Sequence, residues 1–311
     1  MKKAFILGII SSFFFSFTFI LNSQMNISGG SWLWSSSLRF LFMLPLLFVG
    51  IVINKSLGKV ISEIKKAPTS WLLWSTVGFG LFYAPLSLAS QYGSSWLVAG
   101  TWQITIIAGA LISPLFTTKV KAERGMTEER NKLPKKFLLI SSIILIGIFL
   151  MQFEEAKSLS LSECLIGMAP VLVAAFAYPL GNRKMIELCD NKLSTIERVF
   201  GMTLCSLPFW LIISIFGTLS VGLPSQDQLI QSFIVAIFSG IIATVLFFKA
   251  TDLVGGDTHK LAIIESTQAG EVIFTLLGSI LFLNDSLPTS IAILGLFLVV
   301  VGMILNSMSQ T

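Results

Sequence analysis

Long apolar runs separated by short polar segments follow one another from end to end of the chain. A helix needs about 20 apolar residues to cross the roughly 30 Å hydrocarbon core of a bilayer. The pattern therefore predicts an all-α integral membrane protein with ten transmembrane helices. The predicted spans are 4–22, 31–53, 70–90, 95–116, 136–153, 163–182, 199–219, 229–251, 261–283 and 288–306.

The basic residues give the predicted orientation. With the N-terminus inside, 19 of the 21 Lys and Arg residues lie in loops or at span ends on the cytoplasmic side. Lys157 is in an external loop, and Arg39 lies within the second span. Because basic residues mark cytoplasmic loops, this split favours ten spans in the plasma membrane, with both termini in the cytoplasm.

Composition excludes several classes of protein. The 311 residues are 54% hydrophobic and 12% charged, about half the charge of an average soluble domain. The positive charges lie at helix ends, where they are expected to meet membrane lipid headgroups and not nucleic acid. The single His and the three Cys residues show no metal spacing, and no Walker-type phosphate-binding segment is present. We expect no metal, no cofactor and no catalytic residues.

The spans divide into two similar sets of five. The stretch 81–116 resembles 246–282, and a shift of 165 positions places Trp102-Gln103 on Thr267-Gln268. Five is odd, so the second set must enter the membrane from the opposite side. The sequence thus predicts two inverted five-helix repeats, 1–155 and 156–311, with a solvated, mobile cytoplasmic loop at 117–135. Such repeats are typical of secondary transporters that bind substrate between the halves, near the midplane.

The second half resembles a known family. The segment from Glu271 to Gly278, then Leu283 to Pro288, then the Gly295–Gly302 helix is similar to the end of the ten-span drug/metabolite transporter superfamily, in particular its EamA-type and multidrug-resistance efflux members. The first half agrees at Asn22 and at Arg39-Phe40. The chain departs from the pattern at Val272, Asn284-Asp285 and Thr117-Thr118-Lys119. The resemblance implies a transporter in which one chain carries both repeats, and it leaves a dimer open.

Glu271 is the residue that suggests a mechanism. It lies eleven residues from Lys260, which is about 16 Å along a helix and near the bilayer centre. An ionised carboxylate there must be paired, hydrated or protonated. We therefore interpret Glu271 as a proton-coupling residue, a structural or gating partner of Arg39, or a hydrated polar residue. Glu265, a second candidate for coupling, could instead face cytoplasmic water.

The remaining candidates for the substrate pocket are polar or aromatic residues within spans. Gln268 and Thr275 share a broad helical face with Glu271 and Glu265. Aromatic faces attract organic cations. The other candidates are Trp102, Gln103, Arg39, Tyr178, Tyr83 and Asn22.

These features predict a secondary active transporter rather than an enzyme. The leading hypothesis is a proton-coupled efflux pump for small organic compounds, working by alternating access, whose partners are a small-molecule substrate and protons. The alternative is an exporter or facilitator of a metabolite, such as an amino acid, a sugar or a nucleotide precursor, without proton coupling at Glu271. A polytopic membrane enzyme is a remote third possibility.

Overall fold

The chain is helical along every predicted span in this computed structural model, which describes residues 1–311 except 123–124, 134, 157–160, 256, 284–286 and 309–311. Lys157 and Asn284-Asp285 lie outside the described residues. Helices satisfy each backbone N–H and C=O within one segment, as hydrocarbon requires. In the described part of the chain, seven segments are long and apolar enough to cross a membrane, namely 2–27, 32–53, 68–89, 135–153, 195–221, 226–252 and 260–283.

Two shorter apolar helices, 95–111 and 290–306, accompany these seven segments. The prediction of an α-helical membrane protein is confirmed at this level, and the arrangement as ten spans remains a prediction. The elements of the first half are α1 (Lys2–Ile27), α2 (Trp32–Ile53), α3 (Leu57–Lys66), α4 (Pro68–Ser75), η1 (Thr76–Gly80), α5 (Leu81–Ala89), α6 (Ser95–Trp102), α7 (Ile104–Leu111), η2 (Ser113–Leu115), β1 (Thr117–Ala122), β2 (Gly125–Arg130) and α8 (Lys135–Ala156).

The second half begins with a helix that continues well past its predicted end at 182. Its elements are α9 (Leu161–Cys189), α10 (Thr195–Val221), α11 (Gln226–Val235), η3 (Ala236–Ala243), α12 (Thr244–Asp252), α13 (Thr258–Ser266), η4 (Thr267–Ala269), α14 (Gly270–Gly278), η5 (Ser279–Leu283) and α15 (Ser290–Met308).

Serine residues fix where several helices begin. The side chains of Ser31 and Ser225 accept hydrogen bonds from the first turns of α2 and α11. Ser194 and Glu197 form a reciprocal capping box at the start of α10. Each bond satisfies a backbone N–H that has no partner within its own helix, so the polar loops define the helix ends.

The loop at 117–135 contains structure that the sequence analysis did not predict. β1 and β2 pair as an antiparallel hairpin, from Thr117 opposite Arg130 to Ala122 opposite Gly125. Its base is joined to the end of the fourth predicted span by a hydrogen bond from the Asn131 N–H to the Phe116 carbonyl (3.0 Å). Both strands are short and mostly polar, so they lack the sustained alternation of apolar residues that predicts a strand. The sequence analysis expected a solvated, mobile loop here, and the hairpin is an addition to an otherwise helical structure.

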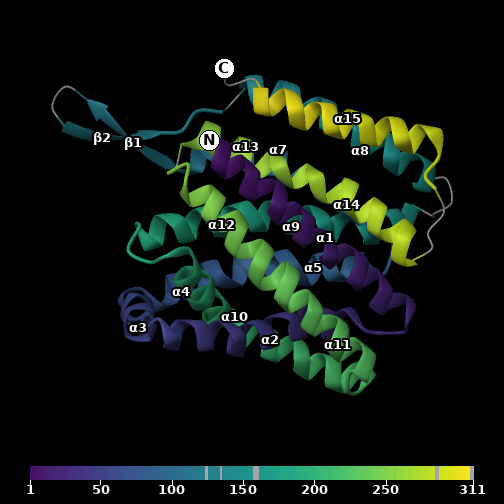
Figure 1. Ribbon diagram of the computed structural model, residues 1–311, viewed down its shortest axis with the longest axis horizontal. Helices are drawn as coiled ribbons and strands as arrows, with labels where there is room; N and C mark the ends of the chain where they lie inside the picture. The colour runs from purple at the N-terminus through teal and green to yellow at the C-terminus, as the bar shows by residue number, and fades with distance from the viewer. Residues whose placement is uncertain (123–124, 134, 157–160, 256, 284–286, 309–311) are drawn as a thin grey trace.

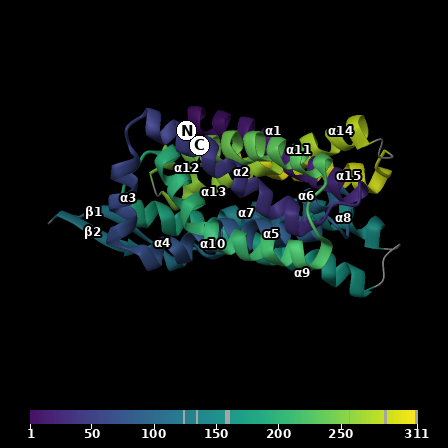
Figure 2. The ribbon, with the colours of Figure 1, turned by 90° about the horizontal axis from the view of Figure 1, so that it is seen from below.

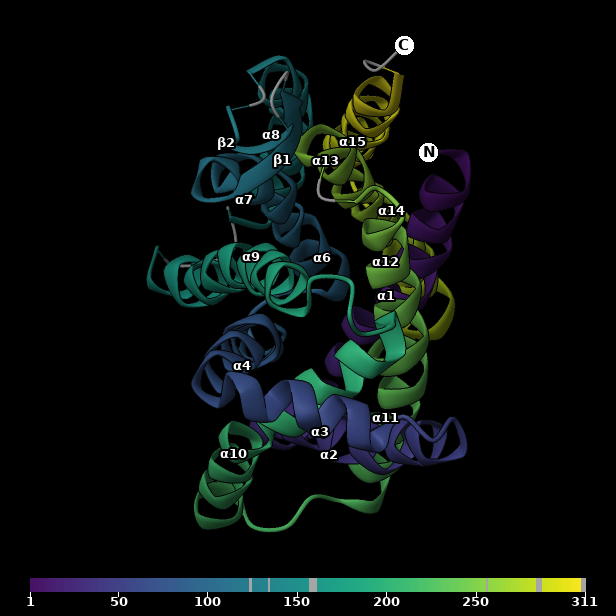
Figure 3. The ribbon, with the colours of Figure 1, turned by 90° about the vertical axis from the view of Figure 1, so that its left-hand side faces the viewer.

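The helices are arranged in two layers (Figures 2 and 3). α1, α12 and α14 lie in one layer, and α5, α7 and α9 lie in the other. α1 packs against η3, α12 and α14, whereas α9 packs against η1, α5 and α7. α2 pairs with α10 at one edge of the molecule and α8 pairs with α15 at the other. The hairpin and α3 lie at the end of the helices that also carries the N-terminus (Figure 1).

Matching irregularities interrupt corresponding helices of the two halves. The π-helical segments η1 and η3 each precede an α-helix, α5 and α12, in the third and eighth predicted spans. In the fourth span α6 ends before Gln103, and in the ninth span the 3₁₀ segment η4 contains Gln268. These two glutamines are the residues that the 165-position shift superimposes.

Glycines let α8 and α15 approach until their backbones touch. A Cβ built on Gly147 would lie 2.5 Å from the Gly295 carbonyl oxygen, and one built on Gly295 would lie 2.5 Å from the Gly147 carbonyl oxygen. Small residues at helix crossings are how membrane helices gain close packing.

We expect Gly147→Ala to force α8 and α15 apart and to lower the free energy of unfolding by about 1–3 kcal/mol, the usual cost of overpacking. Gly50→Ala is the matched control, because a Cβ on Gly50 meets no atom within 4 Å. Unfolding of both variants in detergent measures the difference. Equal stability of the two variants would contradict the backbone contact.

Candidate substrate and proton site

A small cavity lies between the two layers, at the centre of the helical body. It is lined by Phe15, Thr18, Phe19, Phe82, Leu86, Trp102, Tyr178, Gln268 and Glu271. These residues come from α1, α5, α6, α9, η4 and α14, so both halves of the chain contribute. The cavity leaves about 10 Å³ for the centre of a water molecule, which is room for about one water. An organic substrate can enter only if the helices move apart.

Glu271 supplies the carboxylate of this central cavity. It lies in the first turn of α14 and is 1% exposed. The Trp102 side chain lines the cavity beside this carboxylate, and Glu271 Oε1 has no hydrogen-bond partner among the described residues. A buried carboxylate with an unpartnered oxygen is far from satisfied, since its two oxygens can accept about four hydrogen bonds. The site has capacity for a proton, a water or a bound cation.

Aromatic rings form one wall of the cavity. The Phe82 ring centroid lies 4.6 Å from that of Tyr178 and 5.1 Å from that of Trp102. The Trp102 and Tyr178 rings meet edge to face at 5.7 Å. The Tyr178 hydroxyl lies beside Gln268 without a hydrogen bond of good geometry. A carboxylate facing aromatic rings is a favourable environment for an organic cation.

Arg39 lies close to this cavity and is not paired with Glu271. Its guanidinium donates to the Thr18 hydroxyl (3.2 Å) and to the Ser239 carbonyl (3.1 Å). It lies over the Tyr83 ring, 4.1 Å from the centroid. Ser239 is in the π-helical segment η3, whose wider turn lets one carbonyl accept from both Arg39 and Thr244. The Arg39–Glu271 ion pair considered from the sequence does not form.

Glu265 forms a buried ion pair. The Arg183 guanidinium donates to both of its oxygens, at 2.9 Å and 2.7 Å from Nη2 and at 3.2 Å from Nε. Both side chains are 5% exposed. Of the two alternatives for Glu265, exposure to cytoplasmic water does not hold in this conformation, because α9 continues past residue 182 and brings Arg183 against α13.

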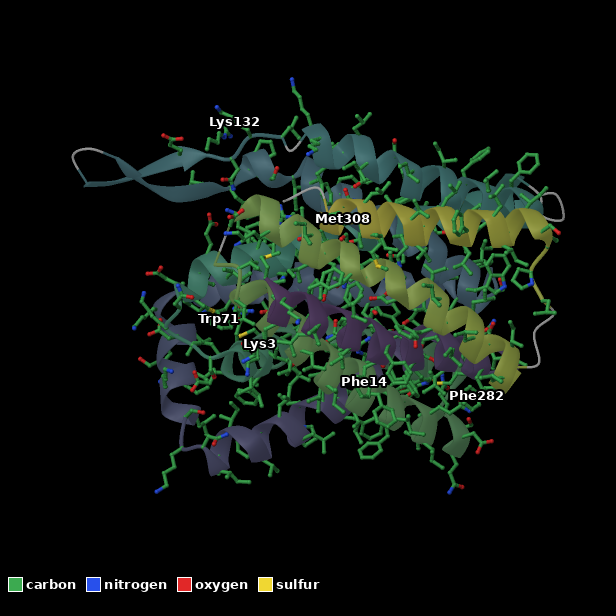
Figure 4. All side chains as sticks on the ribbon, turned by 45° about the horizontal axis from the view of Figure 1, so that its top comes forward. Lys3, Phe14, Trp71, Lys132, Phe282 and Met308 are labelled. Carbon is green, nitrogen blue, oxygen red and sulfur yellow. The ribbon has the colours of Figure 1, made fainter. Side chains whose placement is uncertain are left out.

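Gly109 makes room for that pair. A Cβ on Gly109 would lie 2.3 Å from Glu265 Oε2 and 3.3 Å from Arg183 Nη2. α7, α9 and α13 therefore converge on one buried ion pair. Lys3 and Lys132 lie toward one end of the helices and Phe282 toward the other (Figure 4). α7 and α13 lie near the N-terminus (Figure 1), on the side that the sequence predicts to be the cytoplasmic face.

The structure separates the sequence candidates into groups. Glu271, Gln268, Trp102 and Tyr178 line one cavity. The other candidates are buried but lie outside its lining. Asn22 donates to Tyr83 (3.3 Å) and Ser87 (3.4 Å), the Gln103 amide donates to the Ala99 carbonyl (3.0 Å), and Thr275 Oγ1 has no partner among the described residues.

Sequence reasoning missed Thr18 and Arg183. Ser11, Thr18 and Asn22 are separated by seven and four residues along α1, which places them on one helical face, and this polar stripe in a Phe-rich helix was the available signal. For Arg183, the signal was a membrane carboxylate at Glu265 that required a partner. Among the described residues, no group of three His, Cys, Asp or Glu side chains could hold a metal ion.

Comparison with known proteins decides the family. The family model described as "EmrE: Putative multidrug resistance efflux transporter" matches residues 2–311. The chain belongs to this family, part of the drug/metabolite transporter superfamily. Membership in a transporter family implies that the protein is a membrane transporter and not an enzyme.

Two relatives and one solved structure align with most of this chain. The uncharacterized protein YjlA of Bacillus subtilis (strain 168) is 52% identical over 308 residues, 99% of this chain and 95% of that protein. An uncharacterized 42.1 kDa protein of Shouchella clausii is 49% identical over 269 residues, 86% of this chain and 70% of that protein. A crystal structure aligns over 99% of this chain and 97% of the other with a TM-score of 0.68 at 11% identity, a likeness that shows the fold alone.

We expect Glu265→Gln to lower the free energy of unfolding by about 3–5 kcal/mol, because it leaves Arg183 charged, buried and unpaired. The double variant Arg183→Met/Glu265→Leu should recover most of this loss, since it removes both charges. Glu63→Gln is the control, because the pair of Glu63 with the exposed Lys66 is worth at most about 1 kcal/mol. Denaturation in detergent tests this, and a double variant as unstable as Glu265→Gln would count against the ion pair.

Proposed function

We propose that this transporter exports small organic cations in exchange for protons, with Glu271 binding each of them in turn. The observation that carries the proposal is the Glu271 carboxylate in the central cavity, with one oxygen unpartnered and aromatic rings opposite. An unpaired charge in a low-dielectric interior is strongly unfavourable. Binding of either a proton or a substrate cation neutralises the carboxylate and removes that cost. The two therefore compete for Glu271.

Competition at one carboxylate gives exchange. When the cavity opens to the outside, a proton binds Glu271 and the cation leaves. When it opens to the cytoplasm, the proton leaves and a new cation binds. Trp102 lies beside the carboxylate, and its ring forms the aromatic wall together with Phe82 and Tyr178.

We further infer that the transporter is built as two inverted five-helix repeats, 1–155 and 156–311. The paired irregularities η1 with η3 and Gln103 with Gln268 support this, as does the equivalent packing of α1 and α9. In this conformation the Arg183–Glu265 pair closes the predicted cytoplasmic side. The contacts of Arg39 with Thr18 and Ser239 close the opposite side. Alternating access then requires that the two closures open one at a time.

One observation favours the alternative of a metabolite carrier without proton coupling. The Tyr178 hydroxyl and Gln268 line the same cavity and could recognise polar groups of a sugar or an amino acid. Glu271 would then hold substrate without cycling a proton.

Everted vesicles that carry a pH gradient separate the two functions. Organic cations are expected to dissipate the gradient with the wild type and to fail with Glu271→Gln, because an amide cannot bind a proton at this position. Glu63→Gln should behave as the wild type. If an amino acid or a sugar is transported and Glu271→Gln transports it equally well, the metabolite carrier replaces the exchanger.

A further inference from the structure

A second pocket lies on the predicted cytoplasmic side of the Arg183–Glu265 pair. It is lined by Phe116, Thr117, Asn131, Arg183, Ile186, Glu187 and Leu261, and we call it the vestibule. The vestibule has a volume of about 80 Å³, against about 10 Å³ in the central cavity, and its open mouth adds further space. It is therefore the roomier of the two sites.

The chain places its own ammonium group at the edge of the vestibule. Lys184 Nζ lies 4.9 Å from the centroid of the Phe116 ring and 2.8 Å from Glu187 Oε2. An aromatic face beside a carboxylate is a favourable site for a cation. Lys184 is on a flexible stem and is 27% exposed, so its head can move into water.

A second positive charge lies near the same ring, because the Arg183 guanidinium is 5.8 Å from the Phe116 ring centroid. Arg183 also lines the pocket, but its charge is neutralised by the bidentate contact with Glu265. The lining is mostly apolar, from Phe116, Ile186 and Leu261. A ligand with an apolar body and one positive charge matches this combination.

The vestibule is also in line with the central cavity. Arg183 lines the vestibule and holds Glu265, and Glu271 follows six residues later in the same predicted span, about 9 Å along a helix. Two carboxylates along this route have a cationic partner from the chain itself, because Lys184 pairs with Glu187 and Arg183 pairs with Glu265. A cation moving from the vestibule toward the central cavity could replace these partners in succession.

We propose that the vestibule is a second binding site for organic cations, in which the substrate displaces Lys184 from Phe116 and Glu187 before the Arg183–Glu265 pair opens. The proposal rests on the proposed function for the direction of movement. The site itself requires only the aromatic ring, the carboxylate and the pocket.

Equilibrium binding of radiolabelled tetraphenylphosphonium to the purified full chain in nanodiscs tests the site. The wild type is expected to bind two cations per chain, and Glu187→Gln and Phe116→Leu are each expected to bind one. Lys184→Met should tighten the weaker site several-fold, because the competing ammonium is gone. Glu63→Gln is the matched control, since Glu63 and Lys66 form the same kind of Lys–Glu pair three residues apart.

Glu271→Gln separates this inference from the proposed function. If the wild type binds a single cation that Glu271→Gln abolishes and Glu187→Gln does not affect, the vestibule site is refuted and the central site stands. If Glu271→Gln still binds two cations and Glu187→Gln binds one, the vestibule site stands and the proposed role of Glu271 is refuted. An unchanged affinity in Lys184→Met would overturn the displacement of Lys184.

Discussion

The burial of one carboxylate constrains the rest of the molecule. Glu271 is 1% exposed, and Trp102 lies beside its carboxylate in the central cavity. A charge in such a place must be matched by a proton, a polar partner or a cation. A structural carboxylate would be expected to have its oxygens fully hydrogen-bonded, whereas Glu271 Oε1 is left open beside a cavity. Because Oε1 has no partner, Glu271 is a candidate for binding protons and cations in turn rather than a structural residue.

The contacts of two buried guanidinium groups, those of Arg183 and Arg39, keep the central cavity small. On one side Arg183 and Glu265 are bound to each other, and Gly109 lets α7 close over them. On the other side Arg39 ties α2 to α1 and η3 through Thr18 and the Ser239 carbonyl. Both guanidinium groups are buried and directed at partners from other helices. Separating those helices breaks strong contacts, so a closed conformation is favoured until a ligand or a proton changes the balance.

Much of the fold could be predicted from the sequence, because apolar length and basic loops report the spans directly. The central candidates could be predicted as well: Glu271 from its depth, and Trp102 and Gln268 from the internal repeat. The partners could not. Arg39 donates to the carbonyl of Ser239 in the π-helical segment η3. A hydropathy pattern does not distinguish a π-helical turn from an α-helical one. Arg183 lies beyond the predicted end of the sixth span at 182, because α9 continues to Cys189 through a polar stretch where apolar length no longer marks the helix.

The hairpin shows the same limit of sequence patterns. Its residues are mostly polar, so neither strand carries a sustained period-two apolar signal. The base of the hairpin nevertheless supplies Thr117 and Asn131 to the vestibule. Part of the proposed substrate route is thus built from a segment that the sequence identified only as solvated.

Proton release during substrate binding tests the central claim most directly. Purified transporter in weakly buffered detergent solution would be titrated with tetraphenylphosphonium across a range of pH, with the wild type beside Glu271→Gln. If proton and cation compete for Glu271, the wild type releases up to one proton for each cation bound at the central site, and Glu271→Gln releases none there. Binding to the central site without proton release at any pH would contradict the exchange mechanism.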